Sequence, residues 1–282
     1  MIVMNFMDFF HNTDHDRDKQ KYLSRGTNMQ FDNYTATGSD GRICNMSYRY
    51  AGLPIDKSDI VLVFLHWSPW DASAFDNFLV SNDLGSKYTL VSVDRAGFGD
   101  YQYWDGISDI KEQVKLIIPV VDKFPNHKII IIWHSWWWPI AALTAALYPS
   151  KINWTVVMAW SLDPDLEPAV WWRKILDIKY IRRILPNMIK ASNTELSDTK
   201  NQLTQIVPLW SSYKIPTLII HGTSDMLVNF GNVNFMQKQM TGADLTIDIL
   251  TWENHFLINS SVDHSIQQII NFIDKIQYSW IR

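Results

Sequence analysis

Two patterns of apolar residues alternate along the chain. Continuous runs rich in Val, Ile and Leu are typical of parallel strands that are buried on both faces. Between these runs, apolar residues recur at steps of three and four positions, as in 110–121, which marks one face of a helix. The predicted strands are Met29–Thr35, Ile43–Tyr50, Ile60–Leu65, Tyr88–Val93, Lys128–Ile132, Thr155–Ala159, Thr217–His221 and Asp244–Leu250. The predicted helices are Ala72–Leu84, Ile107–Lys123, Ser135–Tyr148, Asn232–Met240 and Asp263–Gln277.

This alternation indicates an α/β fold with a mostly parallel sheet. The first two strands have no helix between them, which suits an antiparallel edge. Residues 163–214 interrupt the alternation and are rich in helix formers, bulky apolar residues and prolines. A stretch of that length is too long for a plain connection, so we predict a helical cap there. Residues 1–28 are expected to form an N-terminal tail, and residues 29–282 one domain.

Composition and charge argue against several classes of function. The net charge of −4, from 25 basic and 29 acidic residues, argues against a nucleic-acid-binding surface. No basic amphipathic stretch stands out as a membrane surface. The apolar opening Met1–Phe10 is too short for a membrane span and lacks the basic start of a signal peptide. We therefore expect a cytoplasmic protein, although a missing upstream signal or anchor stays open. The oligomeric state is also open.

A serine follows the fifth predicted strand, at the point where a turn into a helix is expected. The segment reads Trp133-His134-Ser135-Trp136-Trp137-Trp138-Pro139. With glycine at 133, 137 and 138 it becomes G-H-S-W-G-G-P, which contains the frame G-x-S-x-G of a serine on a sharp strand-to-helix turn. The segment His66-Trp67-Ser68-Pro69-Trp70 becomes H-G-S-P-G in the same way.

Eight tryptophans stand at such turn-like positions: Trp67, Trp70, Trp133, Trp137, Trp138, Trp154, Trp160 and Trp252. The chain has 14 Trp and only 11 Gly, whereas ordinary usage of about 7% would give roughly 20 glycines. Reading the eight as glycine gives 19 Gly and 6 Trp. We infer that the codon UGA, which a few bacterial lineages read as glycine, is shown here as tryptophan. The alternative is a decayed homologue in which the tryptophans are real.

Read in this way, the sequence resembles the α/β-hydrolase family, and specifically its serine esterase and peptidase-like members with an H-G-x-P-G loop and a G-x-S-x-G elbow. The match extends from about residue 43 to 275, and the triad residues come in the family's order of serine, acid and histidine. The resemblance implies an eight-stranded, mostly parallel sheet with helices on both faces and a helical cap. The matching segments are 66–70, 94–99, 133–139, 221–225 and 253–256.

The resemblance also implies roles for individual residues. Ser135 matches the nucleophile and His255 the base that takes its proton. Asp225 matches the acid that orients the histidine, although Asp163, after the preceding strand, is an alternative acid. Taken alone, these residues are also compatible with a helix N-cap serine, an exposed loop histidine and a turn aspartate. The backbone N–H groups of Ser68 and Trp136 match the oxyanion hole.

These residues predict a serine hydrolase that cleaves a small ester, lactone or amide through an acyl-enzyme. The expected partner is a small-molecule acyl substrate. No cofactor is implied, and no metal-ligand spacing stands out. If the tryptophans are real, the chain is instead a catalytically dead binding or scaffold protein. In that literal chain, we expect Trp133 and Trp137 to crowd the turn at Ser135.

The coding DNA tests the glycine interpretation. We expect UGA codons at all eight positions, and UGG codons at Trp136, Trp171, Trp172 and Trp210, which match no glycine of the motifs. Sequencing of the gene gives the answer directly. UGG codons at Trp133 and Trp137 would contradict the interpretation and favour a decayed homologue.

Overall fold

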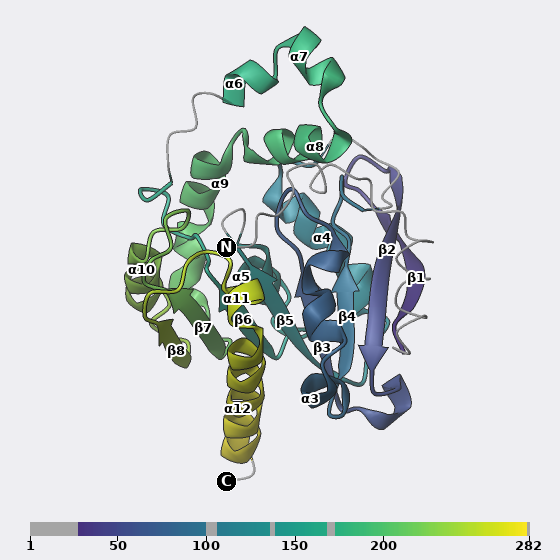
Figure 1. Cartoon of the computed structure of the whole chain (residues 1–282), viewed down its shortest axis with the longest axis vertical. Coiled ribbons are helices and arrows are strands. Elements are labelled where there is room, and N and C mark those ends of the chain that lie inside the picture. Colours follow the sequence, from purple (N-terminus) through teal and green to yellow (C-terminus); the bar gives the residue numbers. More distant parts are fainter. Residues whose placement is uncertain (1–27, 100–105, 136–138, 168–172, 281–282) are drawn as a thin grey trace.

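A single sheet of eight strands runs through the protein, with helices on both of its faces (Figure 1). The computed structural model describes residues 28–99, 106–135, 139–167 and 173–280. Every strand lies within two residues of its predicted bounds. The strands are β1 (Gln30–Thr37), β2 (Ile43–Gly52), β3 (Ile60–Leu65), β4 (Thr89–Val93), β5 (Lys128–His134), β6 (Trp154–Met158), β7 (Thr217–Gly222) and β8 (Leu245–Leu250).

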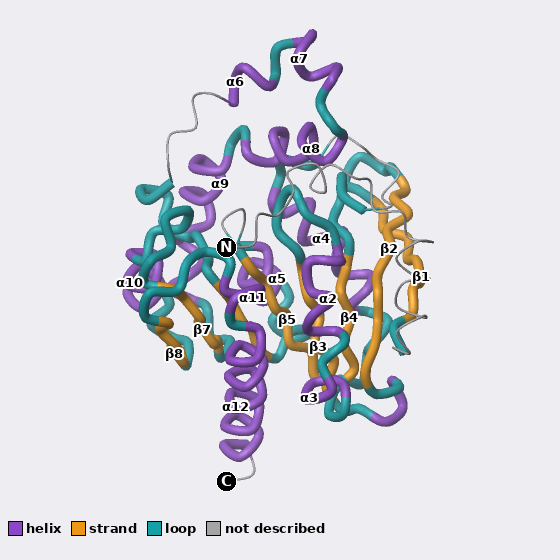
Figure 2. The backbone as a smooth tube through the Cα atoms, in the orientation of Figure 1, coloured by secondary structure: helices purple, strands orange, loops and turns teal. Residues whose placement is uncertain are grey.

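The order of the strands in the sheet is β1-β2-β4-β3-β5-β6-β7-β8. The pairs from β4 through β8 are all parallel. The hairpin of β1 and β2 joins the edge, and β2 pairs with β4 in the antiparallel direction. The predicted mostly parallel sheet with an antiparallel edge is therefore confirmed, and Figure 2 shows the strands in orange side by side.

The sheet separates two hydrophobic cores, because successive side chains of a strand point to opposite faces. In β3 all six residues are buried. Val61, Val63 and Leu65 join the core that α4 (Ile110–Val121), α5 (Ile140–Leu147) and α10 (Gly231–Gln239) cover. The alternate residues Ile60, Leu62 and Phe64 join the core on the other face. The helices on that face are α2 (Asp76–Leu79), α3 (Asn82–Gly85), α11 (Leu257–Ser260) and α12 (Val262–Trp280).

The predicted helix Ala72–Leu84 is wrong in its continuity. The chain forms a 3₁₀ turn, η3 (Ala72–Phe75), and then the short helices α2 and α3. The side chain of Asp71 accepts the N–H of Ser73, and the Ser81 hydroxyl accepts the N–H of Leu84. Such side chains offer the backbone an alternative to helical bonding, so each begins a new helical piece. A further 3₁₀ turn, η2 (Ile55–Lys57), precedes β3.

Between β6 and β7 the chain forms a helical segment above the carboxyl ends of the strands (Figure 1). One of its helices, α8, packs closely on the loop before α4. A Cβ on Gly106 would lie 2.3 Å from the carbonyl oxygen of Ala191, so only glycine allows this approach. The segment lies where the cap was predicted, whereas most of the predicted tail lies outside the described residues. Its helices are α6 (Arg173–Leu176), α7 (Lys179–Ile184), α8 (Asn187–Leu196), α9 (Thr199–Ile206) and η4 (Val207–Ser212).

Candidate active site

Ser135 follows the last residue of β5 and has an unusual backbone conformation. Its φ of 83° lies in the left-handed region, which residues other than glycine adopt rarely. The backbone N–H of Ser135 donates to the carbonyl oxygen of Met158 at 2.9 Å, which ties the turn to the neighbouring strand. The residue is fully buried. Strain of this kind is typical of functional turns, and it fits the sharp bend that the sequence predicts at this serine.

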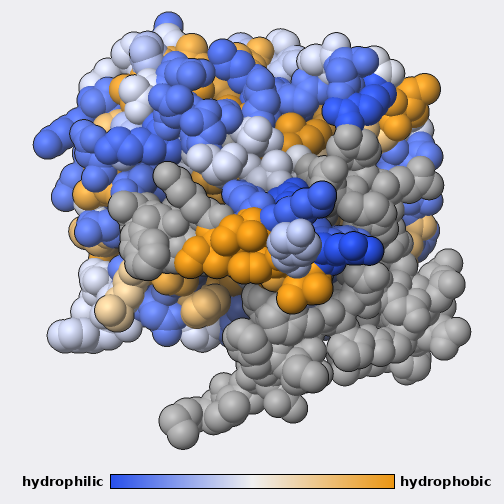
Figure 3. Space-filling model, turned by 90° about the horizontal axis from the view of Figure 1, so that it is seen from above, coloured by the Kyte–Doolittle hydropathy of each residue, from blue (hydrophilic) through white to orange (hydrophobic). Residues whose placement is uncertain are grey.

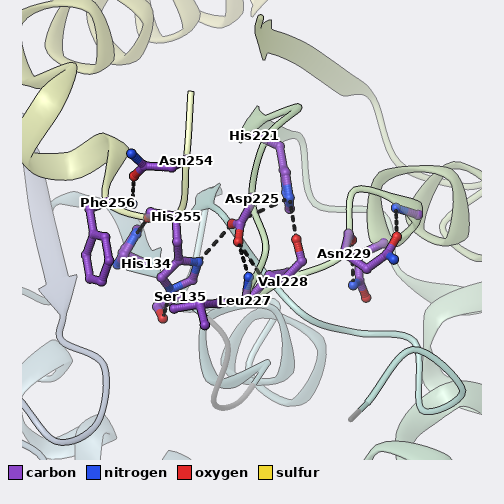
Figure 4. A network of polar contacts seen from close by, with 12 residues as sticks. His134, Ser135, His221, Asp225, Leu227, Val228, Asn229, Asn254, His255 and Phe256 are labelled. Carbon is purple, nitrogen blue, oxygen red and sulfur yellow. Dashed lines mark hydrogen bonds and ion pairs between the residues drawn. The ribbon is translucent and has the colours of Figure 1, made fainter. Parts of the chain in front are cut away.

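His255 and Asp225 converge on Ser135 from two other loops (Figure 4). His255 lies in the loop between β8 and α11, and Asp225 lies in the loop after β7. The hydroxyl of Ser135 contacts Nε2 of His255, and Nδ1 of the same ring lies 2.8 Å from Oδ2 of Asp225. The structure therefore brings together three residues that the sequence separates by up to 120 positions.

The hydrogen bonds around Asp225 fix which nitrogen of His255 carries a proton. The other carboxylate oxygen, Oδ1, accepts the backbone N–H groups of Leu227 and Val228 at 2.9 and 2.8 Å. A carboxylate only accepts, so the neutral ring donates from Nδ1 and leaves Nε2 free to accept the Ser135 hydroxyl. This arrangement can take the proton of the hydroxyl and stabilise the imidazolium that forms.

Two further histidines support the loops of this site, and burial lowers the pKa of both. The ring of His134 donates from Nε2 to the carbonyl oxygen of His255 at 2.8 Å. Burial is the main reason why the pKa of His134 lies well below its usual range, and the nearby His255 lowers it further. The ring of His134 is therefore neutral at pH 7. Nε2 of His221 bonds to the carbonyl oxygen of Val228 at 3.2 Å. Burial lowers the pKa of His221, and the charge of Asp225 opposes that change.

The alternative acid, Asp163, has other partners. Its backbone N–H donates to Oδ1 of Asn232 at 2.8 Å, and its own Oδ1 accepts the N–H of Asp165 at 2.9 Å. The carboxylate of Asp163 thus closes a turn after β6 and is partly exposed. Of the two aspartates, Asp225 is the one whose carboxylate is bonded to His255.

Ser68 lies in a buried loop after β3 that is held by hydrogen bonds. The ring of His66 bonds through Nδ1 to the carbonyl oxygen of Trp67 at 2.9 Å, and its Nε2 accepts the backbone N–H of Arg95 at 3.0 Å. Burial and the charge of Arg95 lower the pKa of His66 to about 3, so this histidine is neutral. The other residue expected at the oxyanion hole, Trp136, lies outside the described residues.

A buried ion pair connects this loop to helix α8. Nη1 of Arg95 lies 2.7 Å from Oε1 of Glu195, and both side chains are almost completely buried. Glu195 also accepts the Ser68 hydroxyl and, at 2.8 Å, Nε2 of Gln113. Burial raises the pKa of Glu195, and the charge of Arg95 opposes that rise. Sequence reasoning missed Glu195, because it lies in no motif and its partner is 100 positions away.

The eight tryptophans that the sequence analysis interprets as glycine, here called the suspect tryptophans, have different environments. Trp252 is 84% exposed and has a φ of 68°, where glycine is favoured. The indole N–H groups of Trp154 and Trp160 are buried and have no hydrogen-bond partner among the described residues. The same holds for Trp210, which matches no glycine of the motifs. The expected crowding by Trp133 is not seen, since its indole is buried and donates to the carbonyl oxygen of Ser135 at 3.1 Å.

The other suspect tryptophans do not test the glycine interpretation. The rings of Trp67 and Trp70 stack, with centroids 5.4 Å apart. Trp137 and Trp138 lie outside the described residues, so the expected crowding by Trp137 stays a prediction.

Within the described residues, no group of three or more His, Cys, Asp or Glu side chains could hold a metal ion. No helix in the same part of the chain has both the length and the apolar character needed to cross a bilayer.

Comparison with solved structures shows the α/β-hydrolase fold. A serine hydrolase from the polyaromatic hydrocarbon-degrading bacterium Cycloclasticus zankles is 17% identical with a TM-score of 0.69, over 88% of this chain and 99% of the other. A putative lipase from Acinetobacter baumannii is 16% identical with a TM-score of 0.65, over 99% of both chains. A thermophilic esterase from Thermogutta terrifontis is 13% identical with a TM-score of 0.63, over 88% and 99%. No family model and no curated protein matches the sequence.

The buried ion pair yields a prediction about stability. Glu195→Leu removes the partner of Arg95 and leaves a buried charge uncompensated, so the free energy of unfolding should fall by about 3–5 kcal/mol. Urea denaturation measures this loss. The matched control is Asp165→Asn, which breaks the exposed ion pair with Lys200 and should have no measurable effect. Equal effects of the two substitutions would contradict the importance of the buried pair.

Proposed function

We propose that the protein is a serine hydrolase in which Ser135, His255 and Asp225 form the catalytic triad. The observation that carries this proposal is the chain of contacts from the Ser135 hydroxyl through both ring nitrogens of His255 to Asp225. A serine hydroxyl is a weak nucleophile, so it needs an adjacent base in this position. The left-handed backbone of Ser135 supports the same role.

The reaction follows from the positions of the protons. Oγ of Ser135 attacks the carbonyl carbon of the substrate as Nε2 of His255 takes the hydroxyl proton. Asp225 stabilises the resulting imidazolium through its bond to Nδ1. The imidazolium then protonates the leaving alcohol or amine, and an acyl-enzyme remains on Ser135. Water, activated by the same histidine, releases the acid and restores the serine.

The negative charge that develops on the carbonyl oxygen requires donors. We assign this role to the backbone N–H groups of Ser68 and Trp136, which match the oxyanion-hole positions of the α/β-hydrolase family, because two preorganised donors stabilise a tetrahedral intermediate. The hydrogen bonds of His66 and Arg95 hold the loop of Ser68. This rigidity supports the assignment, since an oxyanion hole works by being in place before the reaction.

The substrate that we propose is a small ester, lactone or amide. Solved structures with this fold include an esterase, a putative lipase and a serine hydrolase, which supports hydrolysis of an acyl bond. A carboxylesterase-like activity is our first choice, and an aminopeptidase-like activity would use the same triad.

A second candidate function is a catalytically dead protein that binds a ligand or a partner. One observation favours this candidate. The core accommodates the indole of Trp133, and the guanidinium carbon of Arg95 lies over that ring, 5.2 Å from its centroid. A tryptophan that packs and bonds in this way is compatible with a genuine residue. The codon test and the activity tests below separate the two candidates.

Substitution of the triad should separate chemistry from binding. The protein with glycine at the eight positions should hydrolyse short-chain p-nitrophenyl esters and react covalently with a fluorophosphonate. Ser135→Ala should abolish labelling and reduce kcat by several orders of magnitude, since the triad residues act as a unit. Asp225→Asn should reduce kcat by roughly 10³–10⁴-fold, because the ring loses the acceptor that sets its tautomer. The matched control Asp163→Asn should be mild, and the reverse order of the two aspartates would identify Asp163 as the acid.

Restoring glycine should restore activity. The version with all eight tryptophans should be inactive towards the same esters, because at Trp252 a left-handed backbone costs a residue other than glycine roughly 1–2 kcal/mol. Any steric clash of an indole at the eight positions adds to this cost. Initial rates of the two versions at equal concentration test this expectation. Equal rates would show that the glycine interpretation is wrong.

A further inference from the structure

The helical segment between β6 and β7 presents apolar side chains to solvent. Helix α7 contains no buried residue. Two of its apolar side chains, Tyr180 and Ile184, are 82% and 81% exposed and lie one turn apart on the same face. Ile175 and Ile178, which precede the helix, are about half exposed. We call these four residues the apolar ridge.

The ridge lies among basic residues. Residues 173–190 contain six Lys or Arg and one acidic residue, Asp177, a net charge of +5. Because the whole chain carries −4, the rest of the protein carries −9. The side chains of Lys179 and Arg183 are exposed beside the ridge. Figure 3 views the molecule from this end and shows an apolar patch in orange directly beside strongly hydrophilic side chains in blue.

We propose that residues 173–190 dock the protein on an anionic lipid surface. Apolar side chains that enter the boundary between headgroups and acyl chains, next to basic side chains that pair with anionic headgroups, are the two features of an interfacial helix. The ridge supplies the first and Lys179 and Arg183 supply the second. The surplus of acidic residues elsewhere would turn the rest of the protein away from such a surface, so charge also sets the orientation.

The same observations disfavour other partners. In a symmetric dimer built on this face, each ridge would meet its own copy, and two segments of charge +5 would repel one another. A nucleic acid would pair with the basic residues but leaves no role for a tyrosine and an isoleucine that are four-fifths exposed. A lipid surface uses both kinds of side chain.

Docking in this orientation has a consequence for access. The helical segment lies above the carboxyl ends of the strands, where Ser135 and Asp225 follow β5 and β7 (Figure 1). A bilayer bound at α7 would therefore face the end of the molecule that carries these residues. The docking itself does not depend on the proposed catalytic activity.

Sequence periodicity does not reveal this face. Pro186 and the breaks between α6, α7 and α8 divide the segment into short helices, so no long amphipathic repeat is present. For this reason no basic amphipathic stretch stands out along the sequence. The exposed face forms because α7 has no buried residue, so its apolar and basic side chains both face solvent.

Co-sedimentation with vesicles tests the docking. The 282-residue chain with Ser135→Ala should pellet with mixed vesicles of phosphatidylglycerol and phosphatidylcholine and stay in solution with phosphatidylcholine alone. Lys179→Ser with Arg183→Ser should weaken the binding about tenfold or more, and so should Tyr180→Ser with Ile184→Ser. Arg182 is left intact because it bonds to Asp177 and Thr194. The Ser135→Ala background keeps the result independent of hydrolysis.

The control variants change the same residue types elsewhere. Lys57→Ser with Lys87→Ser removes two exposed charges, and Tyr278→Ser removes an aromatic side chain that is 74% exposed near the end of α12. These variants should bind like the parent, and all variants should keep its circular dichroism and melting temperature. Failure of the parent to bind anionic vesicles, or equal loss in the controls, would overturn the proposal. The proposal would also be overturned if sedimentation velocity showed a dimer that dissociates only in the variant Tyr180→Ser with Ile184→Ser.

Discussion

Parallel strands end at a common edge, and this constraint brings together the three residues that converge at the candidate site. β5, β6, β7 and β8 are neighbours in the sheet, so the loops that follow β5, β7 and β8 leave it at the same edge. Those loops carry Ser135, Asp225 and His255. The register depends on apolar runs, because a shift of a buried strand by one residue would exchange the side chains that face the two cores. The convergence of Ser135, Asp225 and His255 is therefore a consequence of how the sheet is packed.

The sequence predicted the sheet well for the same reason. β3 has the predicted bounds, because its six apolar residues are bounded by Asp59 and His66 and all of them are buried. The break in the helix after Asp71 was missed, because the bonds that Asp71 and Ser81 make with nearby N–H groups outweigh the apolar pattern. Glu195 could not have been found, since a carboxylate in a helical segment is ordinarily exposed and its partner depends on tertiary packing.

The eight tryptophans that the sequence analysis interprets as glycine bear on that interpretation in different ways. At Trp252 the backbone is left-handed, a conformation that favours glycine. At Trp133 the backbone places no such demand, and the indole fills a buried space and makes a hydrogen bond. The torsion angles of Trp133 therefore do not test the glycine interpretation, which rests at this position on the frame G-x-S-x-G.

The hydroxyl of Ser68 joins two parts of the protein that have different tasks. It donates to Glu195 in α8 and accepts from Arg95 at 2.9 Å, while its own backbone belongs to the loop after β3. Any outward displacement of α8 would pull the carboxylate from both side chains at once and expose a buried charge. The position of the Ser68 loop is thus coupled to the position of α8 through the carboxylate of Glu195. If a ligand entered by displacing α8, the loop of Ser68 would regain its hydrogen bond to Glu195 only after α8 had moved back to its position.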